Sequence, residues 1–145
     1  MDERKTKSIL WVDDDFKGVS LRSECSELEG YGYNIVKTFD ADEFFNALDK
    51  NKDYACLIID IALPLTDMVK DDEDVMRGLW AGYVILKKIF SEEKYKEIRT
   101  IPIIVYTITS SHKLYKFCEE HDILYIRKID VLPNQFATEV NKFIS

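Results

Sequence analysis

The sequence has no excess of basic residues. Its 20 lysines and arginines are outnumbered by 27 aspartates and glutamates, so the formal net charge is −7 at pH 7. No basic patch and no basic helix stands out, which excludes a protein that coats nucleic acid or an anionic membrane. We therefore expect no direct nucleic-acid binding and no membrane attachment. The acid excess suits a soluble protein that recruits cations.

Long apolar runs are also lacking. No stretch approaches the roughly 18 apolar residues of a membrane span, and the apolar stretch after the charged N-terminus is too short for a signal peptide. The three cysteines, Cys25, Cys56 and Cys118, include no CxxC pair that would hold zinc. We expect them to be reduced core thiols in a cytoplasmic protein, and we expect His112 and His121 at the surface.

The composition is that of a folded domain. The chain has 145 residues, of which 46% are hydrophobic and 12% aromatic, which is enough to bury a core and excludes a disordered tail. It contains no internal repeat, no low-complexity linker and no second zone of composition. We predict a single domain over residues 1–145.

Apolar runs of the strand type alternate with longer amphipathic segments. The runs lie at residues 8–12, 33–39, 54–60, 100–107 and 123–128. Five strand–helix pairs in strict alternation predict an α/β fold, with a doubly wound parallel sheet and right-handed crossovers. The third run is apolar on both faces, as a central parallel strand is when helices cover both sides.

Local signals mark the ends of several predicted helices. Gly30 and Gly32 end the first one. Asp40 and Glu43 have the spacing of a capping box, and an apolar stripe follows them. Pro133 suits the first turn of the last helix, because the missing N–H of proline has no helical partner there.

Polar residues gather at the ends of the predicted strands. In a parallel sheet, ligands bind beyond the carboxyl ends of the strands. Asp13–Asp15, Asp60, Thr107 and Lys128 stand at four such ends. Two carboxylates about 4 Å apart repel each other by roughly 4 kcal/mol at an effective dielectric constant near 20. The cluster therefore protonates or binds a cation, and carboxylate oxygens with room for water suit Mg²⁺.

Four segments together resemble the receiver domain of bacterial two-component response regulators. They are "ILWVDDD", "LIIDIALP", "IPIIVYT" and "YIRK", each at its expected strand end and in the right order. The resemblance covers nearly the whole chain. It implies a flavodoxin-like (βα)5 fold with strand order 2-1-3-4-5, the order that flavodoxin shares with this family.

The resemblance implies a role for each acid of the cluster. Asp60 would be the phosphoacceptor, forming an acyl phosphate with a phosphoryl group from a histidine kinase or a phosphotransfer protein. Asp14, assisted by Asp13 through water, would hold Mg²⁺ together with Asp60 and the backbone carbonyl of Ala62. Asp15 would be a solvated neighbour or a helix cap.

The same resemblance also implies roles for residues at or near the ends of the fourth and fifth predicted strands. Lys128 would pair with Asp60 before the reaction and with a phosphoryl oxygen after it. Thr107 would donate a hydrogen bond to the phosphoryl group. Tyr125, three positions before the lysine, matches the aromatic residue that turns inward when the loop after Thr107 moves. The result would be a switch that signals to a protein effector, with slow autodephosphorylation, rather than a turnover enzyme.

The sequence departs from the family pattern at three places. Ile129 follows the lysine where a cis proline is usual, and because a cis bond without proline costs about 2.5–4 kcal/mol we expect a trans bond and an altered loop. Ile108 follows the threonine where a small residue is usual, which would narrow access to Asp60. An insertion at about 65–81, between the third strand and the third helix, carries an acidic run. We expect this insertion to start the third helix early or to overhang the site and restrict which kinase docks.

Two other functions fit part of the pattern. A phosphohydrolase of the haloacid dehalogenase type would use Asp13 and Asp15 in a DxDx[TV] motif, but Lys17 holds the place of threonine or valine. A pseudo-receiver would keep the fold only as a binding module. The presence of the aspartates, Thr107 and Lys128 argues against a pseudo-receiver. Ile129 and the insertion, which depart from the family pattern, leave this alternative open.

Overall fold

A computed structural model describes residues 7–64, 66–67 and 80–145 of the chain. It contains a five-stranded parallel sheet in the order β2-β1-β3-β4-β5. The strands are β1 (Ser8–Val12), β2 (Asn34–Thr38), β3 (Cys56–Ile59), β4 (Ile103–Thr107) and β5 (Leu124–Arg127). Each predicted run contains one strand, so the predicted sheet and its strand order are confirmed. The fifth strand ends one residue early, because Lys128 already belongs to a helical turn.

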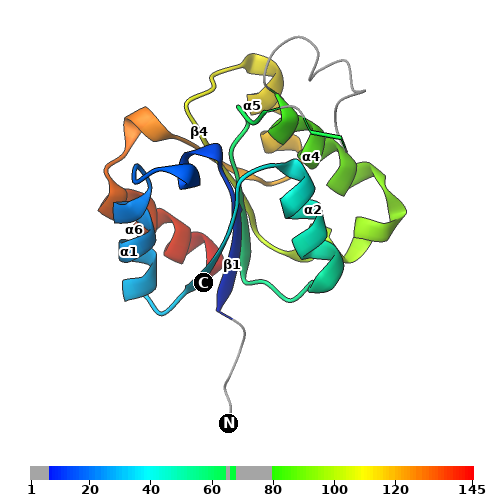
Figure 1. The fold of residues 1–145 in the computed structure, drawn as a ribbon. Helices are drawn as coiled ribbons and strands as arrows, with labels where there is room; N and C mark the ends of the chain where they lie inside the picture. The colour runs from blue at the N-terminus through cyan, green and yellow to red at the C-terminus, as the bar shows by residue number, and fades with distance from the viewer. Residues whose placement is uncertain (1–6, 65, 68–79) are drawn as a thin grey trace.

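Helices cover both faces of the sheet (Figure 1). The α-helices are α1 (Arg22–Gly30), α2 (Ala41–Lys50), α4 (Ala81–Ser91), α5 (His112–Glu120) and α6 (Pro133–Ile144). Within the described residues they are accompanied by three 3₁₀ segments, η1 (Asp14–Lys17), η2 (Glu93–Thr100) and η3 (Lys128–Asp130). Helices α1 and α6 lie on one face, whereas α2, α4 and α5 lie on the other. This is the doubly wound arrangement that the alternation predicts.

Two apolar cores flank the sheet, and β1 supplies both of them. Its side chains alternate between the faces: Ile9 and Trp11 pack with α1 and α6, and Leu10 and Val12 pack with the helices opposite. All four are fully buried. Burial on both faces explains why this strand and β3 read as unbroken apolar runs.

The predicted start of α2 is confirmed in most of its detail. Asp40 is the N-cap, and its side chain accepts a hydrogen bond of 2.9 Å from the N–H of Glu43. The Glu43 carboxylate accepts from the N–H of Phe39 at 2.7 Å, one residue earlier than a capping box requires. Gly32 has a φ of 95°, which suits glycine in the turn that ends α1.

Gly82 lets α4 approach the end of β3 closely. A Cβ atom built on it would lie 2.0 Å from the carbonyl oxygen of Asp60 and 2.6 Å from the Cα of Ile61. The N–H of Gly82 donates to the carbonyl oxygen of Ile61 at 3.1 Å. The first turn of α4 therefore packs directly on the backbone that carries Asp60.

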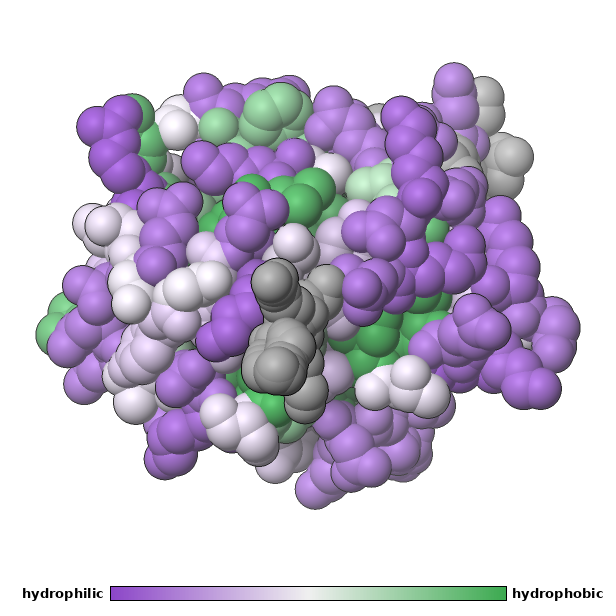
Figure 2. Space-filling model, turned by 90° about the horizontal axis from the view of Figure 1, so that it is seen from below, coloured by the Kyte–Doolittle hydropathy of each residue, from purple (hydrophilic) through white to green (hydrophobic). Residues whose placement is uncertain are grey.

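The predicted insertion at about 65–81 lies largely outside the described residues, as do the early helix start and the overhang proposed for it. The segment between α4 and β4 lies within the described residues. It forms η2, in which Tyr95 and Ile98 are buried against the core. Across the described ranges, no helix has the length and apolar character that crossing a membrane requires. Seen from below in Figure 2, the described surface is mostly hydrophilic, with smaller hydrophobic areas between the polar side chains.

The predicted core position of the three cysteines is confirmed, and one histidine prediction is wrong. All three cysteines are buried and free of disulfides, and burial raises the thiol pKa of Cys25 to about 11 and that of Cys118 to about 12. His112 is exposed as expected. His121 is half-buried instead, with its ring centroid 4.3 Å from that of Phe90 and 4.4 Å from that of Phe117.

Candidate functional site

Charged side chains from β1, β3 and β5 meet at the carboxyl edge of the sheet. Asp13 follows β1, Asp60 follows β3 and Lys128 follows β5. The Lys128 ammonium lies 2.8 Å from Oδ2 of Asp13 and 3.6 Å from Oδ2 of Asp60. The predicted convergence of these three side chains is therefore present in the structure.

The cluster is shielded from water. Asp13 is fully buried, Asp60 is 5% exposed, and the Lys128 side chain is 13% exposed. Burial, followed by the charge of Asp60, raises the pKa of Asp13 to about 7, although Lys128 opposes the rise. Burial works against the charge of Lys128, but the carboxylates of Asp60 and Asp13 outweigh it and raise the lysine pKa. The single positive charge of Lys128 therefore only partly neutralises the negative charges of the two buried carboxylates.

The oxygens of Asp60 differ in their surroundings. Oδ2 faces the lysine, whereas Oδ1 is buried and has no hydrogen-bond partner among the described residues. Leaving a buried acceptor unsatisfied costs about 1–3 kcal/mol. An oxygen in this condition is available to attack an electrophile or to bind a cation.

The donor set fits a hard divalent cation. Asp13 and Asp60 offer buried carboxylate oxygens, burial and then the charge of Asp60 raise the pKa of Asp13, and Ala62 lies half-buried in the turn that follows. Within the described ranges, no three side chains of the His, Cys, Asp or Glu type are arranged to hold a metal together. A cation here would therefore need main-chain carbonyl or water ligands as well, which is the usual coordination of Mg²⁺.

Asp14 lies apart from the lysine cluster. Its side chain is 47% exposed, and its Oδ1 lies 3.6 Å from the ammonium of Lys17, three residues along η1. To bind a cation beside Asp60, this carboxylate has to turn away from Lys17. Its role as a direct metal ligand remains a prediction.

Thr107 joins the ends of two neighbouring strands. It is fully buried, and its Oγ1 accepts from the N–H of Ile61 at 3.4 Å and from the N–H of Thr109 at 3.2 Å. Ile61 directly follows the proposed phosphoacceptor, so the hydroxyl is tied both to that turn and to the β4–α5 loop. Since a hydroxyl also carries one proton, it can still donate a hydrogen bond.

Tyr125 is connected to the same loop. Its hydroxyl donates to the carbonyl oxygen of Thr109, two residues beyond Thr107. Burial raises the pKa of the Tyr125 phenol, so the hydroxyl is protonated and able to donate at neutral pH. Any movement of the loop therefore acts directly on this side chain.

The sequence did not reveal the contact made by Asp15. The helix cap at this place is Asp13, whose Oδ1 accepts from the N–H of Asp15 at 2.9 Å. The Asp15 carboxylate instead lies 3.1 Å from the Lys128 ammonium. Three adjacent aspartates after a strand are the only signal in the sequence, and their spacing does not tell which of them turns back to the site.

Four apolar side chains that lie close in sequence to residues of the site project into solvent. Val19 is 67%, Ile108 61%, Ile129 68% and Leu132 62% exposed. The peptide between Lys128 and Ile129 is trans, as expected, since the described residues contain no cis peptide bond.

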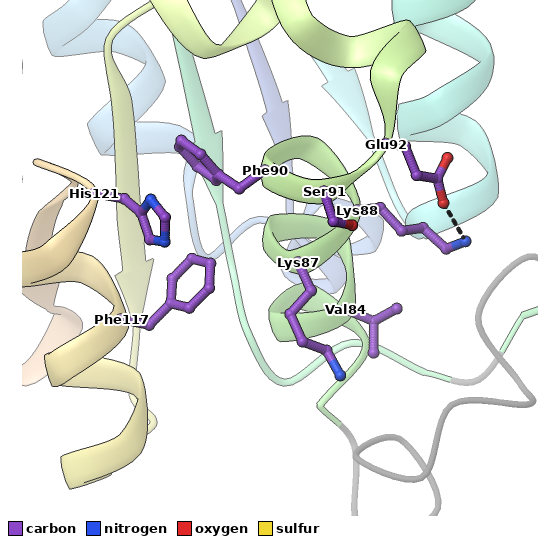
Figure 3. Close-up of a pocket in the computed structure, with 8 residues that line it drawn as sticks. All are labelled: Val84, Lys87, Lys88, Phe90, Ser91, Glu92, Phe117 and His121. Carbon is purple, nitrogen blue, oxygen red and sulfur yellow. Dashed lines mark hydrogen bonds and ion pairs between the residues drawn. The ribbon is translucent and has the colours of Figure 1, made fainter.

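A separate cavity of about 480 Å³ lies between α4 and α5 (Figure 3). Phe90, Phe117 and His121 form its aromatic side, and Lys87 and Lys88 lie across from them. None of the residues that line it belongs to the carboxylate cluster. The candidate site is therefore the carboxyl edge of the sheet rather than this cavity.

The sheet order and its helical layers define the fold of response regulator receiver domains. A CheY-like receiver domain protein from Methanospirillum hungatei JF-1 is 24% identical over 96% of this chain and 94% of its own, with a TM-score of 0.68. A putative response regulator from Chloroflexus aurantiacus J-10-fl is 22% identical over 97% and 98%, with a TM-score of 0.67. The receiver domain of the Francisella response regulator 1452 is 19% identical over 96% and 97%, with a TM-score of 0.68.

These likenesses establish a receiver fold over nearly the whole chain, as the sequence predicts. No protein-family model and no curated protein matches the sequence. The roles of individual residues therefore have to be argued from the geometry of the site.

Proposed function

We propose that this chain is a phosphoacceptor receiver domain that takes a phosphoryl group onto Asp60 from a histidine kinase or a phosphotransfer protein. One observation carries the proposal: a buried carboxylate at the end of the central strand has one unpartnered oxygen and one oxygen facing a lysine. The receiver fold, which extends over nearly the whole chain, supports the same reading.

The transfer moves a phosphoryl group from nitrogen to oxygen. Oδ1 of Asp60 attacks phosphorus, the P–N bond of a phosphohistidine breaks, and its electron pair stays on the imidazole nitrogen, which takes up a proton. The product is an acyl phosphate on Asp60. Mg²⁺ held by Asp13, Asp14, Asp60 and the Ala62 carbonyl would supply charge neutralisation between the anionic carboxylate and the anionic phosphoryl group.

Lys128 and Thr107 then stabilise the product. The ammonium stands 3.6 Å from Oδ2 of Asp60 and can follow the phosphoryl oxygens once they arrive. The Thr107 hydroxyl donates a hydrogen bond to a phosphoryl oxygen and pulls the β4–α5 loop inward. Because Thr109 in that loop accepts from Tyr125, this movement reaches β5, and we infer that a protein effector reads the face of α5, β5 and α6.

The surroundings of the site favour a protein as donor. Ile108 and Ile129 directly follow Thr107 and Lys128 in the sequence and project into solvent, where the surface of a protein donor can cover them.

Incubation with phosphoramidate and Mg²⁺ tests the proposal. We expect a single addition of one phosphoryl group by intact mass, with loss of the label in Asp60→Asn and after chelation of the metal. Asp53→Asn, which changes an exposed aspartate ahead of β3, is the matched control and keeps the label. Equal labelling of Asp60→Asn refutes Asp60 as the acceptor, and no labelling of the wild type favours the pseudo-receiver.

The phosphohydrolase alternative would make Asp13 the nucleophile. Both oxygens of Asp13 are engaged, one by the N–H of Asp15 at 2.9 Å and the other by the Lys128 ammonium at 2.8 Å. Asp60 has the less engaged carboxylate, so we place the reaction there. Steady hydrolysis of p-nitrophenyl phosphate that is lost in Asp13→Asn but kept in Asp60→Asn would reverse this choice.

A further inference from the structure

Asp15 makes a contact that the proposed function does not use. Its carboxylate lies 3.1 Å from the Lys128 ammonium, which is closer than the 3.6 Å between that ammonium and Asp60. The Asp15 side chain is 52% exposed, whereas Asp13 and Asp60 are buried. The Lys128 ammonium therefore contacts one carboxylate on the solvent side, that of Asp15, as well as the buried carboxylates of Asp13 and Asp60.

The geometry of η1 aims this carboxylate at the site. Oδ1 of Asp13 accepts from the N–H of Asp15, which fixes the first turn after β1. The turn brings Asp15 beside a lysine that is 113 positions away in the sequence. Lys128 itself begins the three-residue segment η3, and the next two residues, Ile129 and Asp130, are exposed. Because the rest of η3 is exposed, packing of this segment does little to fix the position of the Lys128 side chain.

We propose that Asp15 is a positioning residue that holds Lys128 in the resting protein and competes with the acyl phosphate for its ammonium. The proposal rests on the phosphoacceptor function of Asp60. Lys128 has three N–H donors on a long flexible side chain, and in the resting protein they are shared among Asp13, Asp15 and Asp60. When a cation neutralises Asp13 and Asp60, Asp15 is the carboxylate that still attracts the lysine.

The contact opposes phosphorylation because it exists before the reaction and weakens after it. A phosphoryl oxygen on Asp60 draws the ammonium inward, away from the half-exposed Asp15. Removing the Asp15 charge removes this competition, so the phosphorylated state gains relative to the resting state. The effect is that of one partly exposed ion pair, which corresponds to about a two- to fivefold change in an equilibrium.

Labelling with phosphoramidate and Mg²⁺ measures the competition. We expect Asp15→Asn to raise the steady-state ratio of phosphorylated to unphosphorylated protein about two- to fivefold, and Asp15→Glu to return it toward the wild-type value. Asp130→Asn is the matched control, because this exposed aspartate stands two residues after Lys128 and forms no ion pair with it among the described contacts. An equal rise in Asp130→Asn means a general charge effect and overturns the proposal.

A double-mutant cycle separates positioning from charge. In a Lys128→Met background, Asp15→Asn should leave the labelling ratio unchanged, since no ammonium remains to be released. A rise as large as that in the wild type contradicts the proposal, because Asp15 would then act directly on the anionic donor.

A measurement without phosphorylation keeps the two proposals distinguishable. The ¹H–¹⁵N signal of the Lys128 ammonium, assigned by its loss in Lys128→Met, should shift or disappear in Asp15→Asn and stay in place in Asp130→Asn. Equal spectra for the wild type and Asp15→Asn overturn the positioning role. A wild type that takes no phosphoryl group refutes the phosphoacceptor function, while this spectrum still reports whether Asp15 holds the lysine.

Discussion

Asp13 is a buried carboxyl whose raised pKa makes the stability of the protein depend on pH. It is fully buried, and its pKa is raised to about 7 from 3.8, by burial first and then by Asp60. In the unfolded chain the carboxyl ionises near its ordinary pKa, so between these two pH values the folded protein binds more protons than the unfolded one. The free energy of unfolding therefore falls as the pH rises through this window.

The first prediction concerns this pH dependence. Without Mg²⁺, the contribution of Asp13 is present at pH 4 and is lost as the pH rises toward 7, with a steepest slope of about 1.4 kcal/mol per pH unit. Asp13→Asn removes the ionisation, so its free energy of unfolding should fall less between pH 5 and pH 8. Urea unfolding in the presence of a chelator measures both proteins. Parallel pH profiles would show that the Asp13 carboxyl has an ordinary pKa.

At the scale of the element, the carboxyl ends of the strands position the site, and Gly82 allows α4 to pack closely on the turn after β3. Gly82 packs the first turn of α4 on the backbone of Asp60 and Ile61, and a Cβ there would lie 2.0 Å from the Asp60 carbonyl oxygen. The atom in the way belongs to the backbone, which cannot turn aside as a side chain can. Relief requires α4 or the turn after β3 to move.

Gly82→Ala tests this contact. We expect a loss of about 1–3 kcal/mol in the free energy of unfolding, since overpacking has this typical magnitude, together with weaker labelling of Asp60 because its turn is displaced. Gly30→Ala is the matched control: it ends α1, has no atom within 4 Å of an added Cβ, and should gain stability or stay the same. Equal stabilities of the two variants would mean that α4 adapts freely.

The elements also show which parts of the structure a sequence can predict. The five strands and the approach of Asp60 and Lys128 were predictable, because apolar runs report burial and parallel strands bring their carboxyl ends to one edge. The contact of Asp15 and the stacking of His121 were not. Both depend on the direction in which a side chain leaves a turn or a helix end, and residue order does not determine that direction.

At the scale of the whole molecule, hydrogen bonds connect the site to β5 through the β4–α5 loop. Thr107 accepts from Ile61, which follows the proposed phosphoacceptor Asp60, and from Thr109 in the β4–α5 loop, and Tyr125 donates to Thr109. The chain of contacts thus runs from the end of β3 through the loop to β5. A switch needs two arrangements of such an element with different affinity for the phosphoryl group.

The final prediction separates phosphorylation from its transmission. In labelled wild-type protein, hydrogen exchange should change at residues 108–111 and 124–127 as the loop moves. Tyr125→Phe removes the contact with Thr109 but no group that touches phosphorus, so it should label at the wild-type rate and show a smaller exchange change at β5. Tyr31→Phe, which loses a hydroxyl contact with Thr138 between α1 and α6, is the matched control and should respond as the wild type does. An unchanged response in Tyr125→Phe would mean that the signal leaves the site by another route, and slower labelling would place the tyrosine in the transfer step itself.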